Sequence, residues 1–138
     1  MSVLSLLLNA DAKKIEEKKT VKMEIPRLSA ALGAPFEVEL QPIDPELYAQ
    51  IQESSVNLDK KGQLKNIDSY ALSVRTCVEG IKEPSMKNKD LMKKFGAATP
   101  NDLVKKLFLA GEISDIVQKI SQVNGYTSQD ETDEAVKN

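Results

Sequence analysis

A change in the spacing of apolar residues near the N-terminus constrains the fold of this 138-residue chain more than any other feature. In residues 20–25, and again in residues 36–40, apolar and polar side chains alternate strictly. Such alternation is typical of a β-strand with one buried face. Pro26 and Pro42 close the two runs, and the connector between them contains Gly33. We therefore predict a two-stranded antiparallel ribbon over about residues 19–41. A ribbon of this size is only marginally stable alone, so its apolar face must lie on helices or on another chain.

The remaining apolar residues follow helical spacing. Before the ribbon, an apolar stripe predicts an amphipathic helix over residues 3–18. After it, the pattern predicts a bundle of about five helices, at residues 44–55, 67–81, 88–95, 99–110 and 113–124. Two of these begin with a capping residue followed by proline, at Asp44 and Thr99. Residues 57–65, which contain a glycine and clustered lysines, are predicted to form a loop.

These elements make an α+β protein that is mostly α-helical. One domain is the default for this length, and we assign it to residues 1–125. Aromatic residues make up only 4% of the chain, so aliphatic side chains must fill the core. Residues 126–138 are polar and acidic, and we predict that they form a flexible, disordered tail.

The chain lacks the residue types that most catalytic and metal sites need. It has no histidine, which removes the usual general base, most zinc sites and the nucleophilic triads. Cys77 lies on the apolar face of the helix at 67–81, where a buried thiol is the expected role. Glu37 and Glu39 alternate with the apolar residues of the second strand and are expected to face solvent. Neither glycine-rich phosphate motif occurs, and the acidic tail lacks EF-hand spacing. We predict no enzymatic activity, no cofactor and no metal.

The charge and hydropathy of the chain argue against binding to nucleic acid and against insertion into a membrane. The net charge is −2, although residues 82–106 carry seven lysines. Two helices joined within this stretch resemble a helix-turn-helix, but the second begins Pro100–Asn101–Asp102 and its lysines come later. We expect a solvated face or a contact with an acidic partner there. The apolar run at 3–8 is too short for a membrane span and lacks a preceding basic region, so we expect a protein that remains in the cytoplasm.

What remains for function is apolar surface near the N-terminus. The predicted helix and ribbon either fold back on the domain or pair with another copy or a client protein, for which a strand edge offers free backbone groups. For the second case we predict seven partner-binding side chains: Leu4, Leu7, Leu8, Val21, Met23, Phe36 and Val38.

The order of several short motifs resembles a known family. They are VKMEIPRL at 21–28, FEVEL at 36–40, CVEGIKEP at 77–84, LMKKFG at 91–96 and TPNDLVKKL at 99–107, followed by GEI at 111–113 and residues 120–125. This series resembles the XkdN-like tail assembly chaperones of contractile-tailed phages and of phage-like elements in Gram-positive bacteria. The resemblance spans about residues 3–125.

The resemblance implies a function that composition does not show. Such a protein is expected to bind the tape measure protein and keep it soluble until the tail tube assembles around it, with the tail tube protein as a further partner. It would self-associate, act in the cytoplasm of the bacterial host and be absent from the mature virion. The alternative is a structural tail or baseplate adaptor of a phage or phage-like particle.

Overall fold

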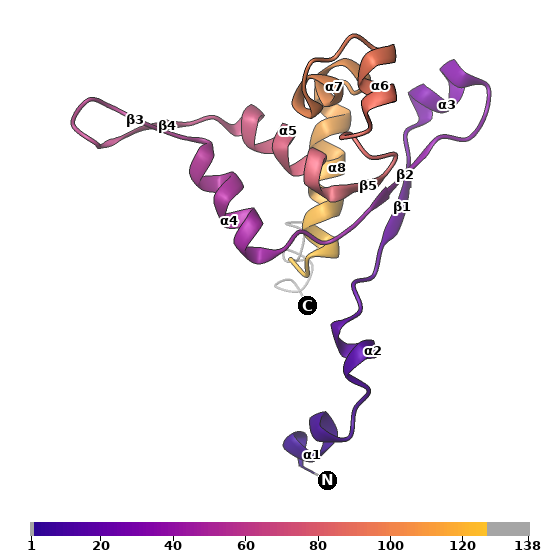
Figure 1. Cartoon of the computed structure of the whole chain (residues 1–138), viewed down its shortest axis with the longest axis vertical. Coiled ribbons are helices and arrows are strands. Elements are labelled where there is room, and N and C mark those ends of the chain that lie inside the picture. Colours follow the sequence, from indigo (N-terminus) through magenta and orange to yellow (C-terminus); the bar gives the residue numbers. More distant parts are fainter. Residues whose placement is uncertain (1, 127–138) are drawn as a thin grey trace, which may run out of the picture.

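The computed structural model describes residues 2–126, so most of the predicted acidic tail lies outside the described residues. Within them, eight helices and two small antiparallel sheets form an α+β fold (Figure 1). The elements are α1 Val3–Leu8, α2 Ala12–Glu16, β1 Val21–Glu24, α3 Pro26–Leu32, β2 Glu37–Leu40, α4 Pro45–Ser54, β3 Val56–Leu58, β4 Leu64–Ile67, α5 Ser69–Gly80, β5 Ile81–Glu83, α6 Lys89–Lys94, α7 Pro100–Leu107 and α8 Ala110–Val123.

The predicted ribbon is confirmed, and the structure adds a third strand to it. β1 pairs antiparallel with β2, so that Met23 lies opposite Val38. β5 pairs with the other edge of β2, which gives the strand order β1-β2-β5. The connector between β1 and β2 holds α3, which begins at Pro26 and ends at Leu32, followed by the capping residue Gly33, where φ is 72°. Proline is well suited to the first turn of a helix, and glycine to the left-handed residue after it.

The loop predicted at residues 57–65 is wrong, because its ends pair as a hairpin. β3 and β4 form a separate two-stranded sheet that projects from the body beside α4 and α5 (Figure 1). Asp59 holds the turn: its Oδ1 accepts from the N–H groups of Lys61 at 2.8 Å and Gln63 at 2.9 Å. Strands of three and four residues are too short for alternation to be recognised in the sequence.

The five helices predicted after the ribbon are present as α4 to α8, and their starts follow the capping chemistry. Asp44 accepts from the N–H of Glu46, and Thr99 Oγ1 accepts from the N–H of Asp102. α8 starts three residues earlier than predicted. There the carboxylate of Glu112 accepts from the N–H of Leu109 at 2.8 Å, which is half of a capping box.

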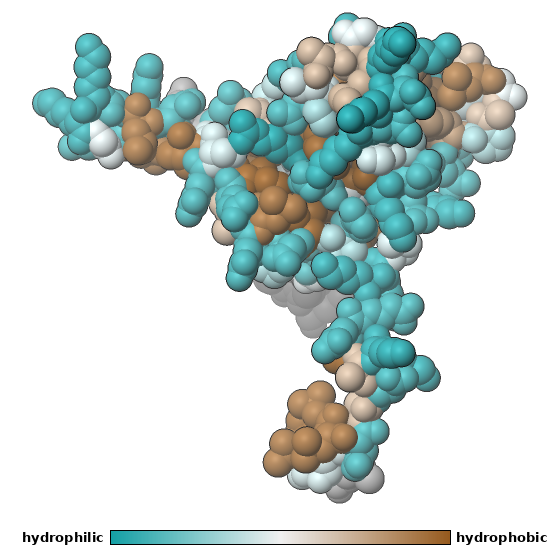
Figure 2. Space-filling view, in the orientation of Figure 1, coloured by the Kyte–Doolittle hydropathy of each residue, from teal (hydrophilic) through white to brown (hydrophobic). Residues whose placement is uncertain are grey.

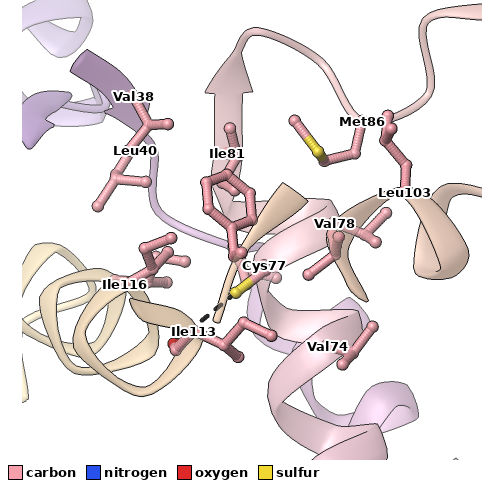
Figure 3. Packing of buried hydrophobic residues seen from close by; sticks show 14 of the residues in the cluster. Val38, Leu40, Val74, Cys77, Val78, Ile81, Met86, Leu103, Ile113 and Ile116 are labelled. Carbon is pink, nitrogen blue, oxygen red and sulfur yellow. Dashed lines mark hydrogen bonds between the residues drawn. The ribbon is translucent and has the colours of Figure 1, made fainter. Parts of the chain in front are cut away.

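The core lies between the three-stranded sheet and helices α5, α7 and α8. Figure 3 shows Val38 and Leu40 of β2 facing Cys77 and Ile81, with Ile116 of α8 beside them. All five are at most 2% exposed. The other buried apolar residues are Ile25, Ile43, Ile51, Val74, Val78, Met86, Leu103, Val104, Phe108, Ile113 and Ile120.

The single helix predicted over residues 3–18 is wrong. The segment forms two short helices, α1 and α2, separated at Asn9–Asp11. Asp11 caps α2 through its side chain, which accepts from the N–H of Lys13 at 3.0 Å. No residue of either helix is buried, and both extend from the body as an arm (Figure 1). We call residues 2–16 the N-terminal arm.

Candidate partner-binding surfaces

The strongest candidate for a partner contact is α1. Its apolar side chains are exposed by 55–75%, and they are Val3, Leu4, Leu6, Leu7 and Leu8. Ser2 caps this helix by accepting from the N–H of Ser5. Figure 2 shows these residues as a compact apolar cluster at the end of the arm, away from the body. A contiguous apolar patch without a partner in its own chain usually marks an interaction site.

The structure does not bring the seven predicted partner-binding residues together. Leu4, Leu7 and Leu8 lie on the exposed arm. The other predicted residues belong to the ribbon and its approach, where they contribute to this chain's own core.

Val21, Met23 and Phe36 are half-buried and pack against the core cluster. Val38, the seventh predicted residue, is fully buried in this chain's own core, because β2 is the central strand and its inward face is covered by helices. Of the two readings of the apolar surface, the ribbon therefore folds back on the domain, whereas the arm does not.

A second exposed apolar site was not predicted from the sequence. Leu58 and Leu64 are cross-strand partners in the projecting hairpin, and they are exposed by 59% and 61%. Cross-strand partners point to the same face of a sheet. The only sequence signal was a leucine on each side of the Asp59–Gln63 turn.

The lysines of residues 82–106 partly serve contacts within the chain. Lys87 Nζ lies 2.9 Å from a carboxylate oxygen of Glu79, and Lys82 Nζ lies 3.7 Å from one of Glu39. Lys105 Nζ lies 5.7 Å from the ring centre of Tyr70. These contacts fit a solvated face with surface ion pairs.

Cys77 takes the structural role expected of it. It is fully buried, and desolvation raises the pKa of its thiol to about 12. Its Sγ lies 3.9 Å from the carbonyl oxygen of Ile113 as a weak donor (Figure 3). Burial and the raised pKa make this thiol a poor nucleophile at neutral pH. Within residues 2–126, no group of three or more acidic or cysteine side chains is arranged to hold a metal ion, and no helix has the length and hydropathy to cross a membrane.

One ion pair fixes α3 against the helical body. Arg27 donates to both carboxylate oxygens of Glu112, at 3.0 and 2.9 Å, and to the carbonyl oxygen of Leu107 at 2.7 Å. The hydrogen bonds from Arg27 lower the pKa of Glu112 below its ordinary value of 4.5. This bidentate pair joins α3 to the junction of α7 and α8, and so holds the ribbon in place.

Comparison with known proteins agrees with this architecture. The chain is 26% identical over 104 residues to the phage-like element PBSX protein XkdN of Bacillus subtilis (strain 168), which covers 72% of this chain and 70% of that protein. It is 29% identical over 84 residues to the uncharacterized protein YqbN of the same organism, which covers 59% and 56%.

The fold is similar to the crystal structure of the protein YqbN, with a TM-score of 0.61 at 18% identity over 92% of this chain and 99% of that one. The family model of the phage XkdN-like tail assembly chaperone proteins matches residues 4–137. The chain therefore belongs to the phage XkdN-like tail assembly chaperone family.

Proposed function

We propose that this chaperone binds the tape measure protein of its phage or phage-like element and keeps it soluble until the tail tube assembles around it. The observation that carries the proposal is the row of exposed leucines on α1, which no other part of residues 2–126 covers. A tail assembly chaperone needs a client, and an apolar helix at the end of an arm is suited to packing against apolar faces of a helical client.

The size of this surface suits many weak contacts better than one tight contact. α1 has only six residues, so one copy buries a small area against a client, and burial contributes about 25 cal/mol per Å² before the costs of association. A long client can bind many copies along its length. Weak individual contacts allow the growing tail tube to displace the chaperone, while their number holds the client in solution.

The test is co-expression with the tape measure protein of the same phage or phage-like element. We expect the wild-type chain to increase the soluble fraction of the tape measure protein and to co-purify with it. The triple variant Leu4→Asp, Leu7→Asp, Leu8→Asp should lose both effects without a change in thermal unfolding, because these side chains have no contacts in the core.

Leu109→Asp is the matched control. Leu109 is 57% exposed, close to the 60% of Leu7, and stands at the N-cap of α8, where Asp is a favoured residue. This variant should solubilise the client as well as the wild type does. If the wild type leaves the solubility of the tape measure protein unchanged and no complex forms, the proposed function is wrong.

The same system separates this function from that of a structural tail or baseplate adaptor. We expect the chain to act in the cytoplasm of the host, with the tail tube protein as the component that replaces it. Mass spectrometry of purified particles should then detect the tube and tape measure proteins but not this chain. A stoichiometric amount in finished particles would favour the adaptor.

A further inference from the structure

The outer edge of β1 is open. β1 is the terminal strand of the β1-β2-β5 sheet, and within residues 2–126 no strand pairs with its other side. Ile25 N–H donates to the carbonyl oxygen of Phe36 at 3.0 Å, so Ile25 occupies a hydrogen-bonded position of the ladder, although the N–H of Phe36 donates to Ser29 Oγ. Because such positions alternate along an antiparallel ladder, Val21 and Met23 also direct their backbone groups toward β2. The N–H and C=O groups of Lys22 and Glu24 therefore face the open edge.

We propose that two copies of this chain associate through this edge, with β1 of one copy antiparallel to β1 of the other. The pairing sets Lys22 opposite Glu24 of the second copy, Met23 opposite Met23, and Glu24 opposite Lys22. In each of the two Lys22–Glu24 pairs, the N–H of either residue donates to the C=O of the other. The two pairs together make four backbone hydrogen bonds around a two-fold axis.

Charge selects this register over its neighbours. A shift of the second strand by two residues in one direction would set Lys22 opposite Lys22, and a shift in the other would set Glu24 opposite Glu24. Like charges directly opposite each other destabilise a strand pair, whereas opposite charges stabilise it. A shift by one residue would set outward backbone groups against inward ones and turn the apolar side chains to the wrong face.

Two further observations favour a second strand at this edge. Glu24 lies opposite Glu37 of β2, and neither Lys22 nor Glu24 makes an ion pair within residues 2–126. A lysine from a second copy would offset that like-charge pair. In addition, a hollow of about 390 Å³ lies beside β1, lined by Lys22, Met23 and four α8 residues, Asp115, Gln118, Lys119 and Gln122. It gives the inward side chain of an added strand, Met23 of the second copy, space beside its counterpart.

Analytical ultracentrifugation of the full chain tests the proposal. A strand pair of four residues buries little area, so association will be weak, and it should be followed from about 10 µM to about 1 mM. Lys22→Glu and Glu24→Lys each create two like-charge pairs, and each should weaken association by about tenfold or more. The double variant Lys22→Glu, Glu24→Lys restores opposite charges across the interface and should restore association.

Both side chains are exposed, so the variants should remain folded, and circular dichroism confirms this before each run. A wild type that stays monomeric up to about 1 mM would overturn the proposal. The proposal would also be overturned if both single variants associated as strongly as the wild type, or if the double variant associated more weakly than either single variant. If Leu4→Asp, Leu7→Asp, Leu8→Asp abolishes association, the contact is the arm and not β1. The proposal does not depend on tape measure binding, which the co-expression assay measures separately.

Discussion

Gly80 of α5 packs directly against Ile120 of α8, and its replacement gives a sharp test of the packing between these two helices. A Cβ at position 80 would lie 2.3 Å from Cδ1 of Ile120, 2.8 Å from Cγ1 and 3.1 Å from Cγ2. Carbon atoms pack best at about 3.5–4.0 Å, so two of these distances are severe overlaps. Cδ1 could rotate away, but Cγ1 is held by the backbone of α8, so α5 and α8 must separate or Ile120 must leave its rotamer.

The expected cost of Gly80→Ala follows from two opposing terms. Overpacking a well-packed core costs about 1–3 kcal/mol. Alanine gains about 0.5–1 kcal/mol over glycine inside a helix, and less at Gly80 because it is the last residue of α5. The net loss in the free energy of unfolding should be about 1–2 kcal/mol, or a fall in Tm of about 3–8 °C for a chain of this length. Urea and thermal unfolding followed by circular dichroism measure both quantities.

Two comparisons make the result interpretable. Gly111 stands in the first turn of α8, and a Cβ added there would have no atom within 4 Å, so Gly111→Ala should be neutral or stabilising by up to about 1 kcal/mol. Ile120→Ala removes all three of these side-chain atoms. It should lower the free energy of unfolding by about 2–5 kcal/mol in the wild type, and by less in the Gly80→Ala background, where it also relieves the overlap. If Gly80→Ala is as stable as Gly111→Ala, or if the two core substitutions are additive, the close packing of α5 on α8 is refuted.

Three further experiments test the burial of Val38, the Arg27–Glu112 pair and the state of Cys77. Val38→Asp buries a carboxylate without a partner and should lower the free energy of unfolding by more than about 3 kcal/mol, so that chemical denaturation shows an unfolded or marginal protein; a stable variant would show that β2 is not central. The lowered pKa of Glu112 means that its ionised carboxylate stabilises the folded protein. This contribution to the free energy of unfolding is fully present above pH 4.5 and is lost as the pH falls through the lowered pKa of the folded state. Glu112→Gln should remove this contribution. Unfolding curves of wild type and variant should therefore converge in acid, and parallel curves would contradict the pairing with Arg27. Cys77 should react with a thiol reagent at pH 8 only as fast as the protein unfolds, because burial raises its pKa to about 12; immediate labelling would contradict a buried thiol.

Local chemistry in the sequence determined most of the secondary structure. Two alternating runs identify β1 and β2, since one face of each strand must be apolar if it is to be buried. Asp44 and Thr99 mark the starts of α4 and α7 because their side chains replace backbone partners that the first helical turn lacks. The same local reasoning placed Cys77 in the core, from its position on the apolar stripe of α5. Each of these inferences uses contacts only a few residues apart.

The tertiary structure decided the rest, because burial and strand pairing depend on residues distant in sequence. β5 joins the sheet only because α5 returns the chain to β2, and this makes β2 central and encloses Val38. Leu7 and Val38 are equally apolar in sequence, yet one lies on an arm without contacts in the core and the other is fully buried. The sequence alone thus determined that apolar surface near the N-terminus exists. Which of it stays exposed was decided by the long-range packing of α5 and α8 against one side of the sheet, since those helices cover the ribbon and leave the arm uncovered.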